Sequence, residues 1–386
     1  MNKINNRVIV IGGNHHNLLG VVRALGKNGV RSTAIITNDT KYAYVKKSKF
    51  IENYVIIPED EGRIFTEILK YKGEKIKPII IPTSDHAAAA IDRNLDKLKK
   101  DFILPSVDRK QGKLLEYMNK QLQYELAKKN RVKMPASEVM ELKQGTQKVH
   151  LSFPIILKPL ESIDGLKSDI RVCQKAQELD ALISFYKEKG YKKILAQEYI
   201  EDKQELCIIG YSVPGMVYVP GVIEKIRIFP VNRGSVSYGK AKSIKGYENI
   251  LKDINRILLN INYEGLFDIE VFKRKDGSYV LNEMNFRNSG NAFIYTLRNK
   301  DLVYMFLKNL INDEISANSA DIEEFYFIDD FLERKQFFAH NIKFKDWWRA
   351  KRMAGISLLK CSYDRRPLIW KKIYAILRRI DRRKLK

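Results

Sequence analysis

The 386-residue sequence is poor in cysteine and has no long hydrophobic run. Its cysteines, Cys173, Cys207 and Cys361, are far apart and form no Cys-x-x-Cys motif, which argues against a disulfide framework and predicts buried thiols in a reducing compartment. No apolar stretch reaches the roughly 18 to 20 residues of a membrane-spanning helix. The first residues also lack the apolar core and cleavage site of a signal peptide. We therefore expect a cytoplasmic protein.

Acidic residues are scarce relative to basic ones. There are 70 Lys and Arg against 46 Asp and Glu, a net charge of +24, and +14 of this excess falls within residues 333–386. A strongly basic C-terminal part predicts anionic partners such as nucleotides, acidic sugars, phospholipids or nucleic acid, among which composition does not choose. The length and the 45% hydrophobic content suit two or three domains.

The N-terminal quarter of the chain alternates between strand-like and helix-like segments, which indicates a parallel sheet covered by helices. Gly12 and Gly13 lack the G-x-G-x-x-G spacing of an NAD-binding loop, and no acid follows the second strand. Because open α/β sheets bind ligands at the carboxyl ends of strands, His15 and Asp85 are candidate substrate contacts. Strands are predicted at residues 8–11, 32–37, 54–57 and 79–81, and a helix at 18–28.

The middle of the chain has a different pattern, with apolar strands joined by hairpin-like turns. Antiparallel pairs of this kind indicate an α+β region. The predicted fold class is therefore α/β in the N-terminal part and α+β after it. A helix is expected at about 109–130, and strands at 153–158, 194–199, 206–211, 217–222, 266–272 and 279–283.

A predicted hairpin between two acidic strands carries the clearest chemistry. Residues two apart in a strand share a face, so Glu283, Asn285 and Arg287 point the same way. On the partner strand Asp268 and Glu270 share a face. Converging carboxylate and amide oxygens suit Mg²⁺, and an arginine can hold phosphoryl or carboxylate oxygens. Spacing alone leaves open a solvated hairpin face with alternating charges, and it does not decide between Asp268 and Glu270.

Two upstream segments could complete a nucleotide site. Lys158 ends an otherwise apolar strand, where a lysine is often only a strand-end charge but can reach phosphate oxygens from a buried platform. Residues 195–201 form an apolar strand that runs into a linker able to present backbone groups to an adenine edge. Glu205 follows this linker, where an acid can bind ribose hydroxyls.

In combination these motifs resemble the ATP-grasp superfamily, and most closely its carbamoyl-phosphate-synthase-like and D-aspartate-ligase-like members. The resemblance covers roughly residues 5–312 and implies an ATP-grasp fold. It implies a Rossmann-like pre-ATP-grasp domain at 1–107, an ATP-grasp domain at 108–315 with a small lid at about 135–200, and a helical, basic C-terminal extension at 316–386. The matching stretches, in the order of the family, are 80–85, 119–120, 153–159, 197–205 and 265–287.

The resemblance implies a role for each ATP-binding residue. Lys120 and Lys158 match the two lysines that contact ATP phosphates. The flexible loop over the triphosphate is usually rich in glycine, whereas the corresponding residues 162–169 hold only Gly165. Backbone amides in such a turn can still cradle phosphate. The adenine and ribose contacts match, in chain order, Glu198, Tyr199, Ile200 and Glu205.

The resemblance also implies a catalytic metal site. Asp268 is not among the matching ligands, and Arg287 matches the arginine that follows them. Lys225 and Arg227 fall where such ligases place cations against the triphosphate and the acyl phosphate. The ligands of Mg²⁺ (or Mn²⁺) match Glu270, Glu283 and Asn285.

The activity that the resemblance implies is an ATP- and Mg²⁺-dependent carboxylate–amine ligase, which forms an amide through an acyl phosphate. Its partners would be small carboxylate and amine substrates. The leading expectation is that the enzyme acts at the inner membrane face and that its substrate is part of a cell-wall or surface-glycan precursor. One alternative is a soluble amino-acid or peptide ligase that makes a small metabolite. The glycine-poor loop leaves a second alternative, a nucleotide-binding protein without ligase activity.

Residues 368–386 have the pattern of a basic amphipathic helix. Such a helix could lie on an anionic membrane surface and make the protein peripheral at the inner membrane face. It could equally pack its apolar stripe on the body of the protein. RNA-reading motifs are absent, so no specific nucleic-acid partner is expected. The apolar positions are Ile369, Ile373, Ile376, Leu377 and Ile380.

Overall fold

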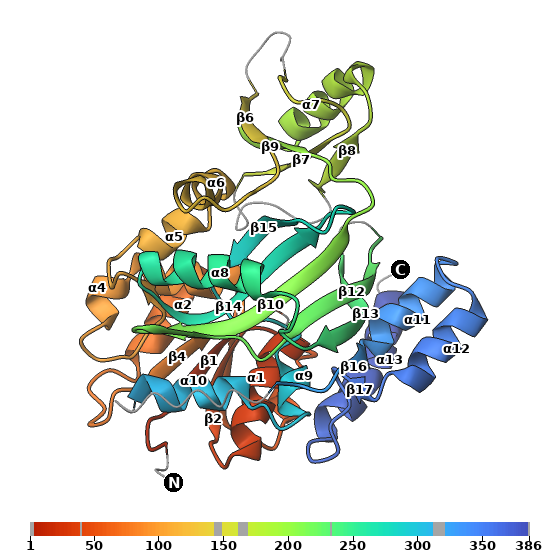
Figure 1. The fold of residues 1–386 in the computed structure, drawn as a ribbon. Coiled ribbons are helices and arrows are strands. Elements are labelled where there is room, and N and C mark those ends of the chain that lie inside the picture. The colour runs from red at the N-terminus through yellow and green to blue at the C-terminus, as the bar shows by residue number, and fades with distance from the viewer. Residues whose placement is uncertain are drawn as a thin grey trace.

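The computed structural model describes residues 4–38, 41–142, 149–160, 169–231, 234–311 and 321–384. It holds three sheets: a parallel sheet, a large and mostly antiparallel central sheet, and a small antiparallel sheet that stands above the others in Figure 1. This arrangement confirms the predicted combination of an N-terminal parallel sheet with an α+β region.

The parallel sheet forms the N-terminal part and has the order β3-β2-β1-β4. Its elements are β1 (Val8–Gly13), α1 (His16–Lys27), β2 (Ser32–Thr37), the 3₁₀ turn η1 (Val45–Lys47), β3 (Ile51–Ile57), α2 (Glu61–Leu69), β4 (Ile79–Pro82), α3 (Asp85–Arg93) and α4 (Leu95–Leu98). Val8 and Val10 pack on the face covered by α1, whereas Ile9 and Ile11 pack on the face covered by α2 and α3. Burial on both faces explains why these strands are continuous apolar runs in the sequence.

The central sheet is built from nine strands: β5 (Ser106–Val107), β10 (Gln204–Val213), β11 (Met216–Tyr218), β12 (Val222–Phe229), β13 (Ser235–Lys242), β14 (Tyr263–Lys273), β15 (Tyr279–Asn285), β16 (Phe325–Ile328) and β17 (Ile356–Ser357). Its main order is β15-β14-β10-β12-β13-β16-β17, with β11 paired to β10 and β5 to β14. On β10, Leu206 and Ile208 pack under α8 (Glu248–Asn260). Ile209 and Tyr211 face the other side, in a core shared with α1 of the parallel sheet. The helices α9 (Phe293–Thr296) and α10 (Leu302–Ile311) also belong to this shared core.

One predicted strand was wrong. The strand expected at 217–222 is divided between β11, which ends at Tyr218, and β12, which begins at Val222. Pro220 lies between them and has no N–H to donate to a ladder. At Gly221 a Cβ atom would lie 2.7 Å from the backbone oxygen of Lys242, so the turn leaves no room for a side chain.

The small sheet has the order β6-β9-β7-β8 and a core of its own. Its elements are β6 (Ser137–Glu141), β7 (Ile155–Pro159), β8 (Arg171–Cys173), η3 (Ala176–Glu178), α7 (Leu179–Glu188) and β9 (Lys193–Glu198). Two helices lead to it, α5 (Lys113–Tyr117) and α6 (Lys120–Lys129), where one continuous helix was predicted. Asn119 divides them, because its side chain accepts hydrogen bonds from the backbone N–H groups of Gln121 and Leu122 and so caps α6.

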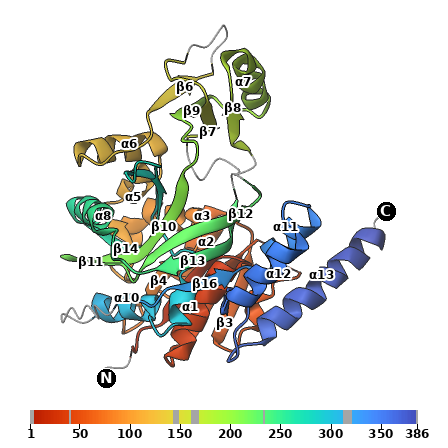
Figure 2. The same ribbon diagram turned by 45° about the vertical axis from the view of Figure 1, so that its right-hand side comes forward.

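The C-terminal part contains α11 (Asp330–Phe338), α12 (Phe344–Met353) and α13 (Arg366–Lys384). It is helical as predicted, but it also supplies β16 and β17 to the central sheet. Figure 2 shows α13 running along the outside of the molecule to the C-terminus.

A buried ion pair attaches this C-terminal part to the parallel sheet. Arg23 of α1 is fully buried, and its Nε lies 3.0 Å from Asp364 Oδ2. The same guanidinium donates to the backbone oxygens of Leu359 and Asp364. Asp364 also accepts a hydrogen bond from the Ser48 hydroxyl at 2.8 Å.

We expect Arg23→Met to lower the free energy of unfolding by about 3–5 kcal/mol, because it leaves the Asp364 carboxylate buried without its cation. Urea unfolding measures the change. Arg31→Met, at an exposed position beside β2, is the matched control and should change the free energy by less than about 0.5 kcal/mol. Equal effects of the two substitutions would show that the buried pair does not hold the C-terminal part in place.

Candidate active site

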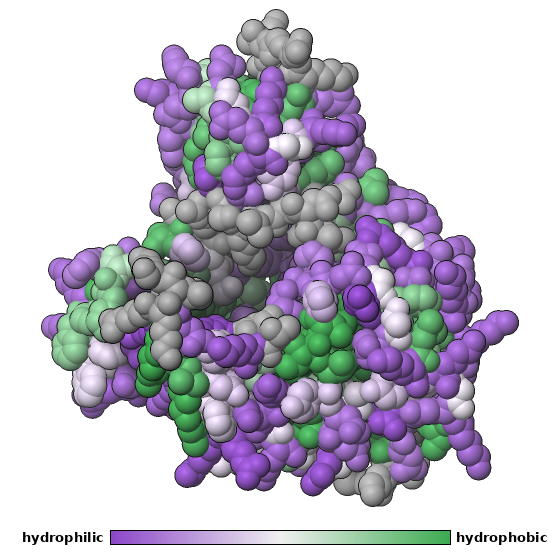
Figure 3. Space-filling view, turned by 180° about the vertical axis from the view of Figure 1, so that it is seen from behind, coloured by the Kyte–Doolittle hydropathy of each residue, from purple (hydrophilic) through white to green (hydrophobic). Residues whose placement is uncertain are grey.

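A cavity of about 510 Å³ lies where the small sheet, the central sheet and the carboxyl edge of the parallel sheet meet. Seen from behind, the surface is hollowed below the small sheet (Figure 3). A volume of this order is typical of small-molecule sites. Most of the predicted site residues line it: His15, Asp85, Lys120, Lys158, Glu198, Tyr199, Ile200, Glu205, Lys225, Glu270, Glu283, Asn285 and Arg287.

Two carboxylates face each other at the centre of the cavity. Glu270 on β14 lies directly opposite Glu283 on β15, and the strand pairing shifts at this point, so that Asn282 is an extra residue. Like charges opposite each other on neighbouring strands repel. Two ammonium groups offset this repulsion: Lys225 Nζ lies 3.1 Å from Glu270 Oε1, and Lys120 Nζ lies 3.3 Å from Glu283 Oε1.

The lysines of the cavity differ in their electrostatics. Burial lowers the pKa of Lys225, but nearby acidic groups, among them Glu205 at 3.4 Å, outweigh burial and hold its pKa well above the usual value. Lys158 on β7 donates to Gln197 Oε1 at 2.9 Å. Burial lowers the pKa of Lys158 to about 8, and the opposing effect of Glu283 is smaller. A bound polyanion would therefore raise the pKa of Lys158 and keep its ammonium group charged.

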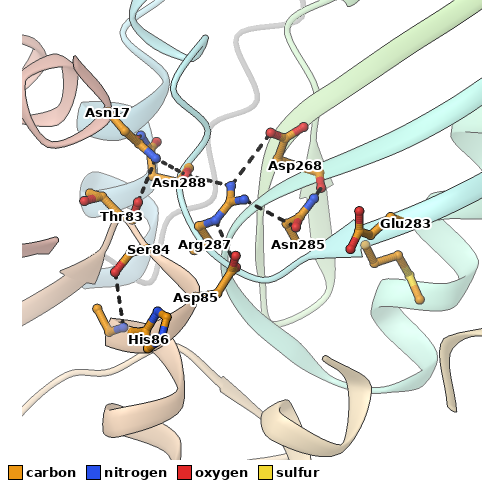
Figure 4. A network of polar contacts seen from close by, with 12 residues as sticks. Asn17, Thr83, Ser84, Asp85, His86, Asp268, Glu283, Asn285, Arg287 and Asn288 are labelled. Atoms are coloured by element: carbon orange, nitrogen blue, oxygen red, sulfur yellow. Dashed lines mark hydrogen bonds and ion pairs between the residues drawn. The ribbon is translucent and has the colours of Figure 1, made fainter. Parts of the chain in front are cut away.

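Arg287 joins the central sheet to the parallel sheet (Figure 4). Its Nε donates to Asp85 Oδ1 at 3.0 Å, at the start of α3, and its Nη2 donates to Asn285 Oδ1 at 3.3 Å. The Asn285 amide in turn donates to the backbone oxygen of Asp268 at 3.1 Å, which leaves the Asn285 oxygen directed toward Arg287. Burial raises the pKa of Asp268, and Arg287, 3.8 Å away, opposes that shift. Asp85, predicted as a substrate contact, is thus held by Arg287.

The predicted adenine linker follows β9. The Glu198 side chain accepts from Arg274 Nη2 at 2.7 Å and so fastens the linker to the hairpin between β14 and β15. Lys203 donates to the backbone oxygen of Ile200 at 3.1 Å, and its ammonium group lies 4.6 Å from the centroid of the Tyr199 ring.

A histidine pair forms the end of the cavity at the parallel sheet. His15 caps α1 by accepting a hydrogen bond from the Asn17 backbone N–H, and its ring lies 3.8 Å from that of His16 between centroids. Burial lowers the pKa of His16 to about 3. His16, burial and the cation Lys371 of α13 together lower the pKa of His15 well below its usual value. Both rings are therefore neutral at neutral pH.

One described residue of the predicted site, Arg227, is not in this cavity. Its guanidinium donates twice to Glu333 of α11, at 2.6 and 3.0 Å. The pairing of β12 with β13 is irregular between Lys225 and Arg227, which interrupts the alternation that would have placed both on one face. Gly165 lies outside the described residues.

Several lining residues escaped the sequence analysis although a signal was present. Lys203 and Cys207 flank Glu205 at a spacing of two, and Phe272 follows Glu270 at the same spacing, so strand alternation places them on the cavity side. The other lining residues not predicted include Gln197, Asn282, Ser289 and Asn291.

The comparisons with known proteins agree with this geometry. Residues 125–302 match the ATP-grasp domain. The chain therefore contains an ATP-grasp domain. The D-aspartate ligase of Enterococcus faecium is 23% identical over 357 residues, which are 83% of this chain and 82% of that protein. The predicted resemblance is therefore confirmed, and with it the expected enzyme class, a ligase that forms carbon–nitrogen bonds.

Solved structures share the ATP-grasp fold. The L-amino acid ligase from Bacillus licheniformis has a TM-score of 0.60 at 16% identity and covers 80% of this chain and 75% of its own. The N5-carboxyaminoimidazole synthetase from Staphylococcus aureus, complexed with ADP, has a TM-score of 0.64 at 14% identity and covers 88% of each chain.

The ATP-grasp family implies a divalent metal ion, and the donor set of this chain fits one. Glu270 and Glu283 converge from paired strands, with Asn285 beside them, and hard oxygen donors of this kind suit Mg²⁺. Within the described residues, no three His, Cys, Asp or Glu side chains gather as an all-protein metal site. A metal held partly by substrate phosphates does not need a third acid.

The position of Arg227 leads to a prediction about stability. Glu333 is fully buried, so Arg227→Met should lower the free energy of unfolding by about 3 kcal/mol, because the carboxylate loses its cation and keeps only the hydrogen bond from the Ser237 hydroxyl. ADP release per folded molecule should be little changed. Urea unfolding and an ADP-release assay measure the two effects. Arg334→Met, at an exposed position of the same helix as Glu333, is the control for stability. Loss of ADP release without loss of stability would return Arg227 to the active site.

Proposed function

We propose that this ATP-grasp ligase binds ATP with Mg²⁺ in the cavity and activates a substrate carboxylate as an acyl phosphate, which an amine then attacks. The observation that carries the proposal is the opposed pair Glu270 and Glu283 with ammonium groups directed at it. A structural hairpin has no reason to place such a half-buried pair beside a third, buried lysine, Lys158, in a cavity that can hold a nucleotide.

The residues of the chain would position the reactants and neutralise charge. Glu270, Glu283 and Asn285 would hold the metal, which supplies a Lewis acid for the phosphoryl oxygens. Lys158 and Lys225 would pair with phosphate oxygens and stabilise the charge that develops during in-line transfer. In this structure the ammonium groups of Lys120 and Lys225 lie beside these carboxylates and balance their charge, as the metal would do when bound.

The nucleoside would lie between the small sheet and the central sheet. The linker at 198–200 follows β9 beside Ile156 and Phe272, which give that end of the cavity apolar walls. Glu205 lines the same end and would bind ribose hydroxyls.

The substrate carboxylate would face Arg287, on the side of the cavity formed by the parallel sheet. The neutral His15 and His16 at that end can donate or accept hydrogen bonds without adding charge. The named relatives are a D-aspartate ligase and an L-amino acid ligase. These relatives support an amino acid as the carboxylate substrate.

A second candidate concerns the amine. The leading expectation from the sequence, a cell-wall or surface-glycan precursor modified at the inner membrane face, is favoured by the exposed apolar and basic side of α13. A small-metabolite ligase is compatible with the same active site. The alternative of a nucleotide-binding protein without activity is disfavoured by the complete set of Glu283, Asn285 and Lys158.

The test is an ADP-release screen over amino acids paired with amines, followed by Glu283→Gln. The substitution keeps the size of the side chain but removes a metal-binding charge, and we expect ADP release to fall by about 10²-fold or more, as for the loss of a main charge-stabilising group. Circular dichroism should show an unchanged fold. Asp276→Asn in the turn of the same hairpin is the matched control and should keep normal activity. Unchanged turnover in Glu283→Gln would rule out the metal assignment, and no ADP release with any pair would rule out the ligase.

The pKa of Lys158 predicts a pH dependence of nucleotide binding. Below about pH 8 the side chain is already charged, whereas above it the nucleotide must bind together with a proton. The dissociation constant for ADP with Mg²⁺ should therefore rise above pH 8, by at most about tenfold per pH unit for one linked proton. Calorimetry between pH 7 and 9.5 measures this. Lys158→Gln should bind more weakly at pH 7 and show a flatter profile; an unaltered profile would show that another group titrates.

A further inference from the structure

One side of α13 attaches the helix to the body. The rings of Trp370 and Tyr374 pack against the segment that contains Tyr42 and η1, with the Tyr42 and Tyr374 centroids 5.4 Å apart. Lys47 Nζ lies 4.2 Å from the centroid of the Trp370 ring. Lys371 is largely enclosed, with its ammonium group 4.4 Å from the centroid of the Phe331 ring of α11. Aromatic and polar contacts, rather than isoleucines, therefore hold this helix.

The isoleucines form a separate stripe that faces solvent. Ile369, Ile373, Ile376 and Ile380 are 52%, 37%, 60% and 44% exposed. Their spacing of four, three and four places them on one face of the helix. Of the two alternatives left open by the sequence, packing of this stripe on the body is excluded by the structure.

A second exposed apolar group lies on the neighbouring helices α11 and α12. Phe338 is 70% exposed, Phe344 59%, Trp348 49% and Met353 47%. Seen from behind, hydrophobic side chains lie among hydrophilic ones on the flank that the C-terminal helices form (Figure 3). Monomeric proteins rarely leave apolar side chains gathered in this way unless something covers them.

The cations beside these exposed apolar side chains indicate what kind of partner covers them. Lys372 and Arg379 are exposed beside the isoleucine stripe, and Lys345 and Arg349 are exposed on α12. Residues 333–386 carry a net charge of +14, so two such surfaces would repel each other, whereas an anionic surface would attract them. None of the described helices is long and apolar enough to cross a bilayer. A surface with isoleucine, phenylalanine and tryptophan beside lysine and arginine suits the boundary between headgroups and acyl chains.

We propose that α13, together with the exposed side chains of α11 and α12, docks on an anionic lipid bilayer. The isoleucine stripe enters the acyl boundary, and the flanking cations pair with lipid phosphates. This surface includes the apolar positions of residues 368–386 and the exposed aromatic side chains of α11 and α12. It does not depend on the ligase reaction, since docking requires neither ATP nor a substrate.

The test is co-sedimentation of the full chain with sucrose-loaded vesicles, either phosphatidylcholine alone or phosphatidylcholine with phosphatidylglycerol, without nucleotide. We expect binding to the anionic vesicles, weakened by salt, and little binding to the neutral ones. Serine at all four isoleucine positions 369, 373, 376 and 380 should lower the partition coefficient at least tenfold. The pair Lys372→Glu and Arg379→Glu should also lower it.

The matched control is Lys128→Glu with Lys129→Glu, which reverses two exposed charges at the end of α6 and should leave the partition unchanged. We expect each variant to fold, because all the substituted side chains are exposed, and thermal unfolding checks this. Equal partitioning of the serine variant, or no binding of the full chain to anionic vesicles, would overturn the proposal. So would a dimer of the full chain, seen by light scattering, that the serine variant dissociates. None of these outcomes alters ADP release, so failure of the docking surface and failure of the ligase are distinguishable.

Discussion

Two carboxylates face each other across a pair of antiparallel strands, and the surroundings of Glu270 and Glu283 follow from the need to offset their repulsion. At an effective dielectric constant near 20, two like charges about 4 Å apart repel by roughly 4 kcal/mol. Lys225 reaches the pair from β12, across β10, and Lys120 reaches it from α6. A lysine at the first position of a helix is unfavourable for the helix dipole. Its place at the start of α6 is therefore explained by Glu283 and not by the helix.

A second charged side chain, Arg287, links the central sheet to the parallel sheet. This guanidinium is shared between Asp85 of α3 and Asn285 of β15, so the predicted metal ligand and the far end of the cavity are coupled by one side chain. The core supports this coupling, because residues of α1 and of β10 pack in one continuous cluster. Relative movement of the two sheets would separate charges as well as apolar surfaces. The cavity is thus bounded on two sides by parts that cannot move independently, while the small sheet has a core of its own.

Strand alternation predicted that Glu283, Asn285 and Arg287 share a face, whereas the resemblance to the family supplied the choice of Glu270 and the roles of Lys120 and Lys225. Glu283 and Asn285 are two residues apart in a regular strand, and the same rule could have found Phe272 from Glu270. The resemblance placed Arg227 beside Lys225, but the irregular pairing between these two residues turns Arg227 away from the cavity, and it depends on the fit between β12 and β13, which leaves no local trace in the sequence. The burial of Glu333, which determines the partner of Arg227, is likewise a tertiary property. At two positions, a local signal overrode the apolar pattern from which an element was predicted. The cap at Asn119 divides the predicted helix, and the missing N–H of Pro220 divides the predicted strand.

The C-terminal helix reverses the usual distribution of side chains. An isoleucine contributes about 1.5–3 kcal/mol when it is fully buried, yet α13 leaves four of them exposed, while Lys371 is partly buried. Burial lowers the pKa of Lys371 to about 8, and Asp329 only partly compensates. This arrangement lowers the stability of the isolated chain. Contact between the isoleucine stripe and the acyl chains of a bilayer would recover that free energy. Lys371 also lowers the pKa values of His15 and His16 at the end of the cavity. Burial and the contact between the two rings are the larger causes, so the helix that would meet the bilayer adds to an effect that already keeps both histidines neutral. Docking would fix the position of that end of the cavity relative to the lipid.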